Sequence, residues 1–221
     1  MNTSRSFATR LSAFLLPATL ALVACAPPAD KSTSELHQTA ALETAAPAGN
    51  WTLVPESSRL SFVSIKNNAV TEVHRFNSMS GQVSEDGMAS LTVELESVET
   101  GIEIRNQRMR EMLFETALYP QARISLKVDA QMLSRLEPGE FERVETQATL
   151  ALHALSASVP ALLRVTRVDA QHYLVTSEQP VVVNAAAFNL LDGIEKLREV
   201  AGLQAIAGGV PVSFNLLFKR G

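Results

Sequence analysis

From Trp51 onward the chain alternates apolar and polar residues in many short segments, and this alternation is the feature that most constrains its fold. The clearest segment, residues 91–96, places three aliphatic side chains on one face of a strand and polar side chains on the other. Turn residues such as Glu85-Asp86-Gly87 and Glu137-Pro138-Gly139 separate neighbouring segments. Looser alternation predicts further strands at 60–66, 70–77, 80–84, 122–128, 149–153, 161–168, 173–176 and 212–218.

One-sided alternation over many consecutive strands predicts an antiparallel sheet whose apolar face must be covered. Closing such a sheet into a barrel removes its exposed edges and encloses an interior. Two segments break the period of two. Residues 102–114 are charged, rich in helix-forming residues and free of glycine and proline, and residues 185–203 carry aliphatic residues near helical spacing. We therefore expect an all-β fold with one or two short helices.

Residues 1–24 have the pattern of a signal peptide. Arg5 and Arg10 supply a positive start, and the apolar run at 11–23 is shorter than the roughly 20 residues of a bilayer-spanning helix. The run ends in Leu22-Val23-Ala24-Cys25, which resembles the bacterial lipobox, where the cysteine is acylated and the signal is cut just before it. Cys25 is the only cysteine of the chain, so no internal disulfide can form. We expect a lipid anchor on Cys25, the alternative being an ordinary cleavage site.

Residues 25–49 are rich in small residues and proline and lack periodic apolar residues, so we expect a lipid-anchored flexible tether there and a folded domain at 50–220. Ala26 follows the cysteine in place of an aspartate, which by analogy with enterobacterial sorting favours the outer membrane over the inner membrane. The mature protein would then lie on the periplasmic side of the envelope. Removing residues 1–24 deletes two arginines and no acid, so the formal charge moves from −4 to −6, which argues against a nucleic-acid partner.

Three patches that together span most of residues 50–220 match one known family in order and spacing. They are Trp51-Thr-Leu-Val-Pro55 with Ser58, Leu60 and Phe62; Val98-Glu-Thr100-Gly101 with Arg105-Asn106, Met109-Arg110, Phe114 and Tyr119-Pro120; and Asn184 with Phe188-Asn189-Leu190. In these patches the chain resembles the YceI-like family of bacterial lipid- and polyisoprenoid-binding proteins. The resemblance implies a lipocalin-like antiparallel β-barrel of about eight strands that holds a long apolar chain in its lumen.

The chain departs from this family's usual pattern in each of three places. Asn106 and Arg108 stand where the family usually has an aspartate and a histidine. The residues at 154–157, Ala-Leu-Ser-Ala, replace a glycine-containing turn. In the third patch, Ala185, Ala187 and Asn189 stand where the family usually has an arginine, an acid and a glycine. We expect the fold to be kept, whereas contacts to a ligand head group do not carry over from the family.

The sequence contains almost no residue pattern that is typical of a catalytic or metal-binding site. There is no glycine-rich phosphate loop, no Gly-x-Ser-x-Gly and no His-Glu-x-x-His motif. His37 lies in the predicted tether, and the other histidines, His74, His153 and His172, are isolated at polar or strand-end positions. They could converge on a metal from separate strands, but nothing in their spacing requires it. We predict that the protein is not an enzyme and uses neither a cofactor nor a metal ion.

A barrel of about eight strands has room for packed side chains or for one small ligand. From the pattern alone the bulky apolar residues fit a filled core and a lined cavity equally well, and the family resemblance favours the cavity. The candidate ligand contacts are Phe62, Phe76, Leu91, Val93, Leu95, Phe114, Leu150, Leu152, Phe188, Leu190, Phe214 and Leu216, with Met109 and Met112 on the helix over the entrance.

Arg105 is the candidate contact for a phosphate or another polar head group, because a guanidinium binds phosphate bidentately and because Arg105 matches the family motif. A solvated helix surface, in which Arg105, Arg108 and Arg110 pair with Glu103 and Glu111, is the alternative.

Together these patterns predict a lipid-anchored periplasmic binding protein for a polyisoprenoid, quinone-like or fatty-acyl ligand. The alternative is an envelope protein-interaction module whose barrel surface contacts a membrane redox or assembly partner. The sequence leaves open which of the three ligand types is bound and whether the protein is a monomer or a homodimer.

Overall fold

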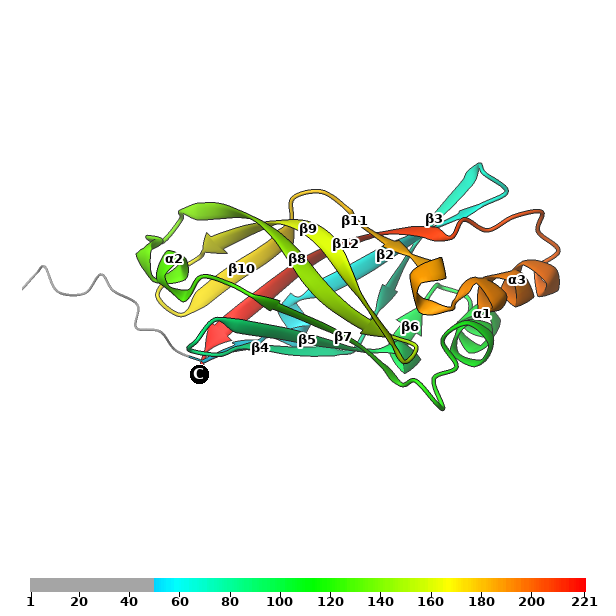
Figure 1. Cartoon of the computed structure of the whole chain (residues 1–221), viewed down its shortest axis with the longest axis horizontal. Coiled ribbons are helices and arrows are strands. Elements are labelled where there is room, and N and C mark those ends of the chain that lie inside the picture. The colour runs from blue at the N-terminus through cyan, green and yellow to red at the C-terminus, as the bar shows by residue number, and fades with distance from the viewer. Residues whose placement is uncertain (1–49) are drawn as a thin grey trace, which may run out of the picture. The chain divides into compact units, whose positions relative to one another are not determined.

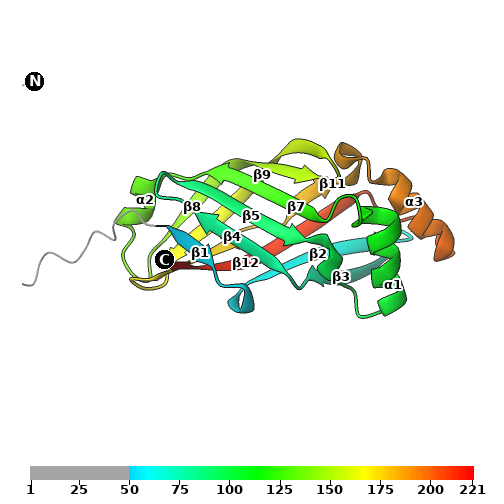
Figure 2. The same cartoon turned by 90° about the horizontal axis from the view of Figure 1, so that it is seen from below.

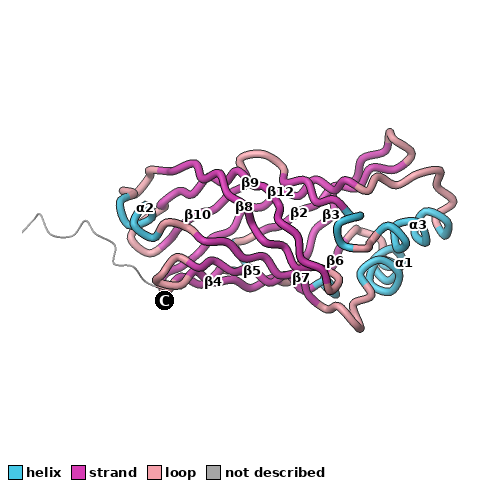
Figure 3. Tube along the Cα trace, in the orientation of Figure 1, coloured by secondary structure: helices cyan, strands magenta, loops and turns pink. Residues whose placement is uncertain are grey.

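The computed structural model describes residues 50–221. Cys25, His37, the predicted signal peptide and the whole of the predicted tether lie outside the described residues. Within them, twelve strands form one antiparallel sheet, and short helices lie at its two ends (Figures 1 and 3). None of the helices in this part of the chain is long and apolar enough to cross a membrane.

The sheet closes into a barrel because β1 pairs with β12 on one side and with β4 on the other. Each strand of the closed circuit is hydrogen-bonded to the next, and every pair is antiparallel. This confirms the predicted antiparallel barrel of about eight strands. In order around the barrel, the strands are β1 (Trp51–Leu53), β4 (Met79–Val83), β5 (Met88–Glu94), β7 (Gln121–Lys127), β8 (Phe141–Leu152), β9 (Leu155–Arg167), β10 (His172–Ser177) and β12 (Gly209–Arg220).

The four remaining strands lengthen the barrel toward one end. β2 (Arg59–Lys66) and β11 (Val181–Asn184) pair with β12, while β3 (Val70–Phe76) pairs with β2, and β6 (Val98–Glu99) pairs with β3. The short 3₁₀ turns η1 (Pro55–Ser57) and η2 (Leu95–Ser97) mark the places where the chain passes from β1 to β2 and from β5 to β6.

Helices cover both ends of the barrel (Figure 2). At one end, which we call the helix end, α1 (Glu103–Arg108) continues as a single π-helical stretch, η3 (Met109–Phe114), and packs beside α3 (Leu191–Val200). At the other, the sealed end, α2 (Ala130–Arg135) lies over the strand ends. α2 has no counterpart in the sequence prediction. Asp129 caps its N-terminus, because the Asp129 side chain accepts the N–H of Gln131 at 2.8 Å.

The helix predicted at 102–114 is confirmed by α1 and η3. The helix predicted at 185–203 begins later than expected. Residues Ala185–Phe188 form a 3₁₀ turn (η4), and Asn189 adopts a left-handed φ of 54° that ends it, so that α3 starts at Leu191. The change of direction at Asn189 separates two short elements that share one apolar spacing in the sequence.

One of the two predicted turns, at Gly87, connects neighbouring strands, while the other, Glu137-Pro138-Gly139, lies between α2 and β8. Gly87, between β4 and β5, has a φ of +84°, and a Cβ there would lie 2.2 Å from the carbonyl oxygen of Val128. The hairpin of β8 and β9 turns through His153 and Ala154, with φ of 51° and 61°. Two consecutive positive φ values match the right-handed twist of the strands, so this tight turn forms without the family's glycine.

Candidate functional site

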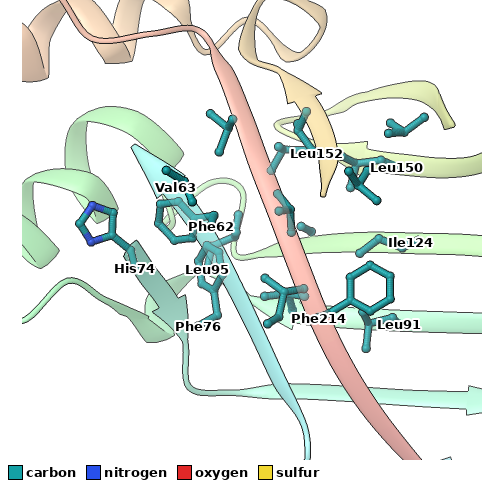
Figure 4. Close-up of a pocket in the computed structure, with 18 of the residues that line it drawn as sticks. Phe62, Val63, His74, Phe76, Leu91, Leu95, Ile124, Leu150, Leu152 and Phe214 are labelled. Carbon is teal, nitrogen blue, oxygen red and sulfur yellow. The ribbon is translucent and has the colours of Figure 1, made fainter. Parts of the chain in front are cut away.

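The barrel encloses a cavity of about 400 Å³ whose walls are almost entirely apolar. This volume lies within the range of about 300–1,000 Å³ that is typical of pockets for small molecules. In Figure 4, Leu91, Ile124, Leu150 and Phe214 surround the central part of the cavity with carbon atoms alone. The alternation that builds the strands therefore leaves an apolar interior that side chains do not fill completely.

Most of the predicted ligand-contacting residues line this cavity, and their contact with a ligand stays a prediction. Strands supply eight of them, α1 and η3 supply three, and η2 and the segment before α3 supply one each. The residues that line it are Phe62, Phe76, Leu91, Val93, Leu95, Arg105, Met109, Phe114, Leu150, Leu152, Leu190, Phe214 and Leu216.

Met112 and Phe188 do not line the cavity, contrary to the sequence prediction. In the π-helical η3, hydrogen bonds run from i to i+5, so Leu113 and Phe114, and not Met112, follow Met109 on the cavity side. Phe188 is 1% exposed, and its side chain packs in the hydrophobic core without reaching the cavity wall. The left-handed residue that follows it turns the chain, and Leu190 takes the place on the cavity wall.

The basic side chains of the cavity wall gather at the helix end. Lys66 comes from the last position of β2, His74 from the middle of β3, and Arg105 and Arg108 from α1. We call these four residues the basic cluster. Ser64 lies among them, and no aspartate or glutamate of the described residues lines the cavity.

Glu72, which does not itself line the cavity, organises three members of the basic cluster. Its Oε2 atom accepts hydrogen bonds from Lys66 and from Nη1 of Arg105, the latter at 2.8 Å, and lies 3.9 Å from Nε2 of His74. The hydrogen bond from Lys66, together with the one from Arg105, lowers the pKa of the Glu72 carboxyl group below its usual value. Glu72 therefore stays ionised and holds the cations in place.

His74 is buried, with 4% of its surface exposed, next to the ring of Phe62 (Figure 4). Its Nε2 atom lies 2.9 Å from Oγ of Ser64, while its buried Nδ1 atom has no hydrogen-bond partner among the described residues. Burial lowers the pKa of His74, and the charge of Arg105 lowers it further, so the imidazole is held in its neutral form. The expectation of an isolated histidine at a polar or strand-end position is wrong, because register places His74 opposite Phe62 inside the barrel.

Asn106 positions the start of α1 and thereby Arg105. It is 2% exposed, and its Oδ1 atom accepts the backbone N–H of Thr100 at 2.9 Å and the Thr100 hydroxyl at 2.6 Å. Next to it, Arg105 donates through Nη1 to Glu72 and through Nη2 to the carbonyl oxygen of Thr100. The Nε atom of Arg105 is buried without a hydrogen-bond partner in the described part of the chain.

Arg110 fits the solvated helix surface that the sequence offered as an alternative. Its guanidinium bonds Glu103 at 2.6 Å and contacts Glu96 at 3.3 Å, away from the cavity wall. Arg105 and Arg108 instead line the cavity.

The other two described histidines each lie beside one carboxylate. Nε2 of His153 is 2.8 Å from Glu115, and Nδ1 of His172 is 2.9 Å from Asp169. No three His, Cys, Asp or Glu side chains within residues 50–221 lie close enough together to hold a metal ion.

Comparison with known proteins identifies the family. The family model for the YceI-like domain matches residues 51–218. The chain belongs to the YceI-like family. Among solved structures, it is 40% identical to a polyisoprenoid-binding domain from Saccharophagus degradans implicated in plant cell wall breakdown, with a TM-score of 0.76 over 77% of this chain and 98% of that one. BcnA from Burkholderia cenocepacia is 20% identical, with a TM-score of 0.59 over 75% and 98%, and shares the fold. None of the curated proteins matches the chain.

In this YceI-like barrel, several departures from the family's sequence pattern fall at the helix end. Asn106 fixes α1 through Thr100, Arg108 lies on the cavity wall, and Ala185 lines the cavity beside α3. Two of these three residues, Arg108 and Ala185, lie on the cavity wall, whereas the departure at residues 154–157 falls in the β8–β9 turn and the start of β9.

Proposed function

We propose that the barrel binds one long apolar chain, of polyisoprenoid, quinone-like or fatty-acyl type, inside its cavity. The observation that carries this proposal is the apolar cavity of about 400 Å³ inside the barrel. Each methylene group buried there contributes about 0.8 kcal/mol, which offsets the cost of ordering a flexible chain. The polyisoprenoid-binding domain from Saccharophagus degradans, 40% identical over nearly its whole length, supports the same function.

The test is native mass spectrometry of the purified protein, followed by organic extraction and lipid analysis. We expect a bound mass that disappears on unfolding and that is recovered in the extract. A barrel that is empty in repeated preparations, and that takes up neither isoprenoid nor fatty-acyl probes, contradicts the proposal.

A matched pair of variants tests whether the cavity is where the lipid binds. Leu152→Trp adds bulk on the cavity wall, while Leu118→Trp adds the same bulk at a position that is 71% exposed. We expect the first variant to lose the bound lipid and the second to keep it. Circular dichroism of both variants checks that the fold is intact, and Val93→Trp provides a second plug if Leu152→Trp does not fold.

We also propose that acyl chains on Cys25 hold the protein on the periplasmic side of the envelope, in the outer membrane and not in the inner membrane. Residues 25–49 would then form the tether and residues 50–220 the binding domain. The residues around Cys25 support this proposal through their likeness to a lipobox. In a bacterial host, labelled palmitate should enter the wild-type protein and not Cys25→Ala, and separated membranes should carry only the labelled form. An unlabelled wild-type protein would contradict the anchor.

A further inference from the structure

The cavity is chemically asymmetric along its length. Its ionisable side chains are the basic cluster at the helix end (Lys66, His74, Arg105 and Arg108) and Tyr173 at the sealed end. Between them the walls are formed by aliphatic and aromatic residues, apart from a serine on β5. A ligand in this cavity therefore meets hydrogen-bond donors and positive charge mainly at one end.

The charges at the helix end do not balance. Lys66 and Arg105 share the single carboxylate of Glu72, and Arg108 forms no ion pair with any residue in the described range. With His74 neutral, three positive charges stand against one negative charge, which leaves two positive charges beside an apolar cavity. Charge next to a low-dielectric interior is costly unless it is paired.

Two hydrogen-bonding atoms at this end also lack partners within residues 50–221. Nδ1 of His74 and Nε of Arg105 are both buried and unpaired. In native proteins the large majority of buried polar atoms have a partner, and leaving one unpaired costs about 1–3 kcal/mol. The Nε atom of an arginine is always a donor, and Nδ1 of a neutral histidine is a donor when Nε2 accepts, as Nε2 of His74 can from the Ser64 hydroxyl.

We infer that the ligand is a single-chain amphiphile with an anionic head group, a carboxylate or a phosphate monoester, and that its head lies in the basic cluster with the tail toward the sealed end. This inference rests on the proposed function. An anionic oxygen compensates the excess positive charge and accepts from the unpaired donors at the same time. A neutral hydroxyl or quinone head can accept a hydrogen bond but leaves the charge unbalanced.

The experiment compares probes that share a tail and differ in the head. Palmitate is paired with hexadecanol, and farnesyl phosphate with farnesol, and each is titrated into the full chain after its own lipid has been removed on a hydrophobic resin. We expect the anion of at least one pair to bind about tenfold or more tightly than its alcohol, which is the effect of one charge-assisted contact. The pair with the larger difference shows whether a carboxylate or a phosphate is preferred.

Two variants, Arg108→Gln and Arg110→Gln, test whether the basic cluster causes the preference for the anionic probes. Both variants remove one positive charge from the same helical segment, but only Arg108 lines the cavity. Arg108→Gln should bind the anionic probes about tenfold more weakly than the wild type, and the affinity for the alcohols should change far less. Arg110→Gln should bind all four probes like the wild type.

Each outcome has one consequence. Equal binding of anion and alcohol overturns the head-group inference and leaves the apolar cavity as the binding site. A preference for the anion that survives Arg108→Gln, Arg105→Gln and Lys66→Gln overturns the assignment to the basic cluster. Failure of all four probes to bind overturns the proposed function, and the inference with it.

Discussion

Each end of the barrel holds an arginine that is largely removed from solvent, and the two arginines differ in what their donors contact. At the sealed end, Arg167 is 5% exposed and donates through Nη1 to the carbonyl oxygen of Leu136 at 2.6 Å and through Nε to that of Asp169 at 3.4 Å. At the helix end, Nε of Arg105 is buried without a partner in the described chain. The two Arg167 donors at the sealed end are satisfied by the protein's own backbone, whereas at the helix end one donor of Arg105, its Nε atom, has no partner in the described chain.

Other contacts at the sealed end follow the same pattern. The hydroxyl of Tyr173 donates to the carbonyl oxygen of Leu133 in α2. The ring of Trp51 packs edge-on against the ring of Tyr173, with 4.6 Å between the ring centroids. The hydrogen bond of Tyr173 thus joins β10 to α2 at this end. We expect substitutions at the sealed end to change stability, and substitutions at the helix end to change ligand binding.

The largest effect on stability should come from Arg167→Leu. The change removes a buried guanidinium and leaves the carbonyl oxygen of Leu136 without its donor, so we expect the free energy of unfolding to fall by about 2–4 kcal/mol. Urea denaturation measures this. Arg105→Leu is the matched change at the helix end. Because Lys66 still pairs with Glu72 there, the free energy of unfolding should fall by less than about 1 kcal/mol, while the binding of anionic probes should become weaker. Equal losses of stability in the two variants would remove the distinction between the ends.

Gly193→Ala should have the next largest effect, because it forces apart the helices over the cavity. A Cβ on Gly193 in α3 would lie 2.6 Å from the carbonyl oxygen of Met112 and 2.8 Å from Cα of Leu113, and both are backbone atoms. Overpacking of this kind costs about 1–3 kcal/mol, and we expect faster release of bound lipid as well. Stopped-flow displacement of a fluorescent lipid measures the release.

Gly208→Ala is the control for Gly193→Ala, since its Cβ would meet only the end of the Leu191 side chain, at 3.3 Å. It should release lipid at the wild-type rate. If both variants release lipid equally fast, close packing of α3 against η3 does not hold the cavity shut.

Tyr173→Phe should have a smaller effect, confined to the sealed end. The phenyl ring keeps the contact with Trp51, but the hydrogen bond to Leu133 is lost, so we expect a loss of about 1 kcal/mol in the free energy of unfolding. Hydrogen exchange should show that α2 opens more often, while the rate of lipid release stays unchanged. An increased release rate would indicate that lipid also leaves through this end.

Local patterns were enough to predict the antiparallel strands and the helix at 102–114, because alternation and helix propensity act within a few residues, whereas the barrel of about eight strands came from the family resemblance. They did not predict α2, which is six residues long and lies between two strand segments. They also missed the first half of β8, whose residues are mostly polar and are held in the sheet by pairing with β9 along its full length.

Most of the information that brings the basic cluster together is absent from local patterns. Arg105 meets Glu72 across 33 residues of sequence, and only the register of β2 with β3 places His74 opposite Phe62. One local signal was present, since the alternating positions of β2 run Leu60, Phe62, Ser64 and Lys66, from apolar to charged, and all of them line the cavity.

The smallest predicted effect is the part of the pH dependence of stability that arises from His74 at the helix end. Burial, with the charge of Arg105, lowers the pKa of His74 from 6.5 in the unfolded chain, while Glu72 opposes this shift and Lys66 adds to it. Below pH 6.5 the unfolded chain therefore binds a proton before the folded chain does, so stability is complete above that pH and falls as the pH drops toward the folded pKa. His74→Phe should lose this part of the slope between pH 7.5 and roughly 5.5. Tyr173→Phe, destabilised at the other end, should keep the wild-type slope, and a slope that persists in His74→Phe would place its origin elsewhere.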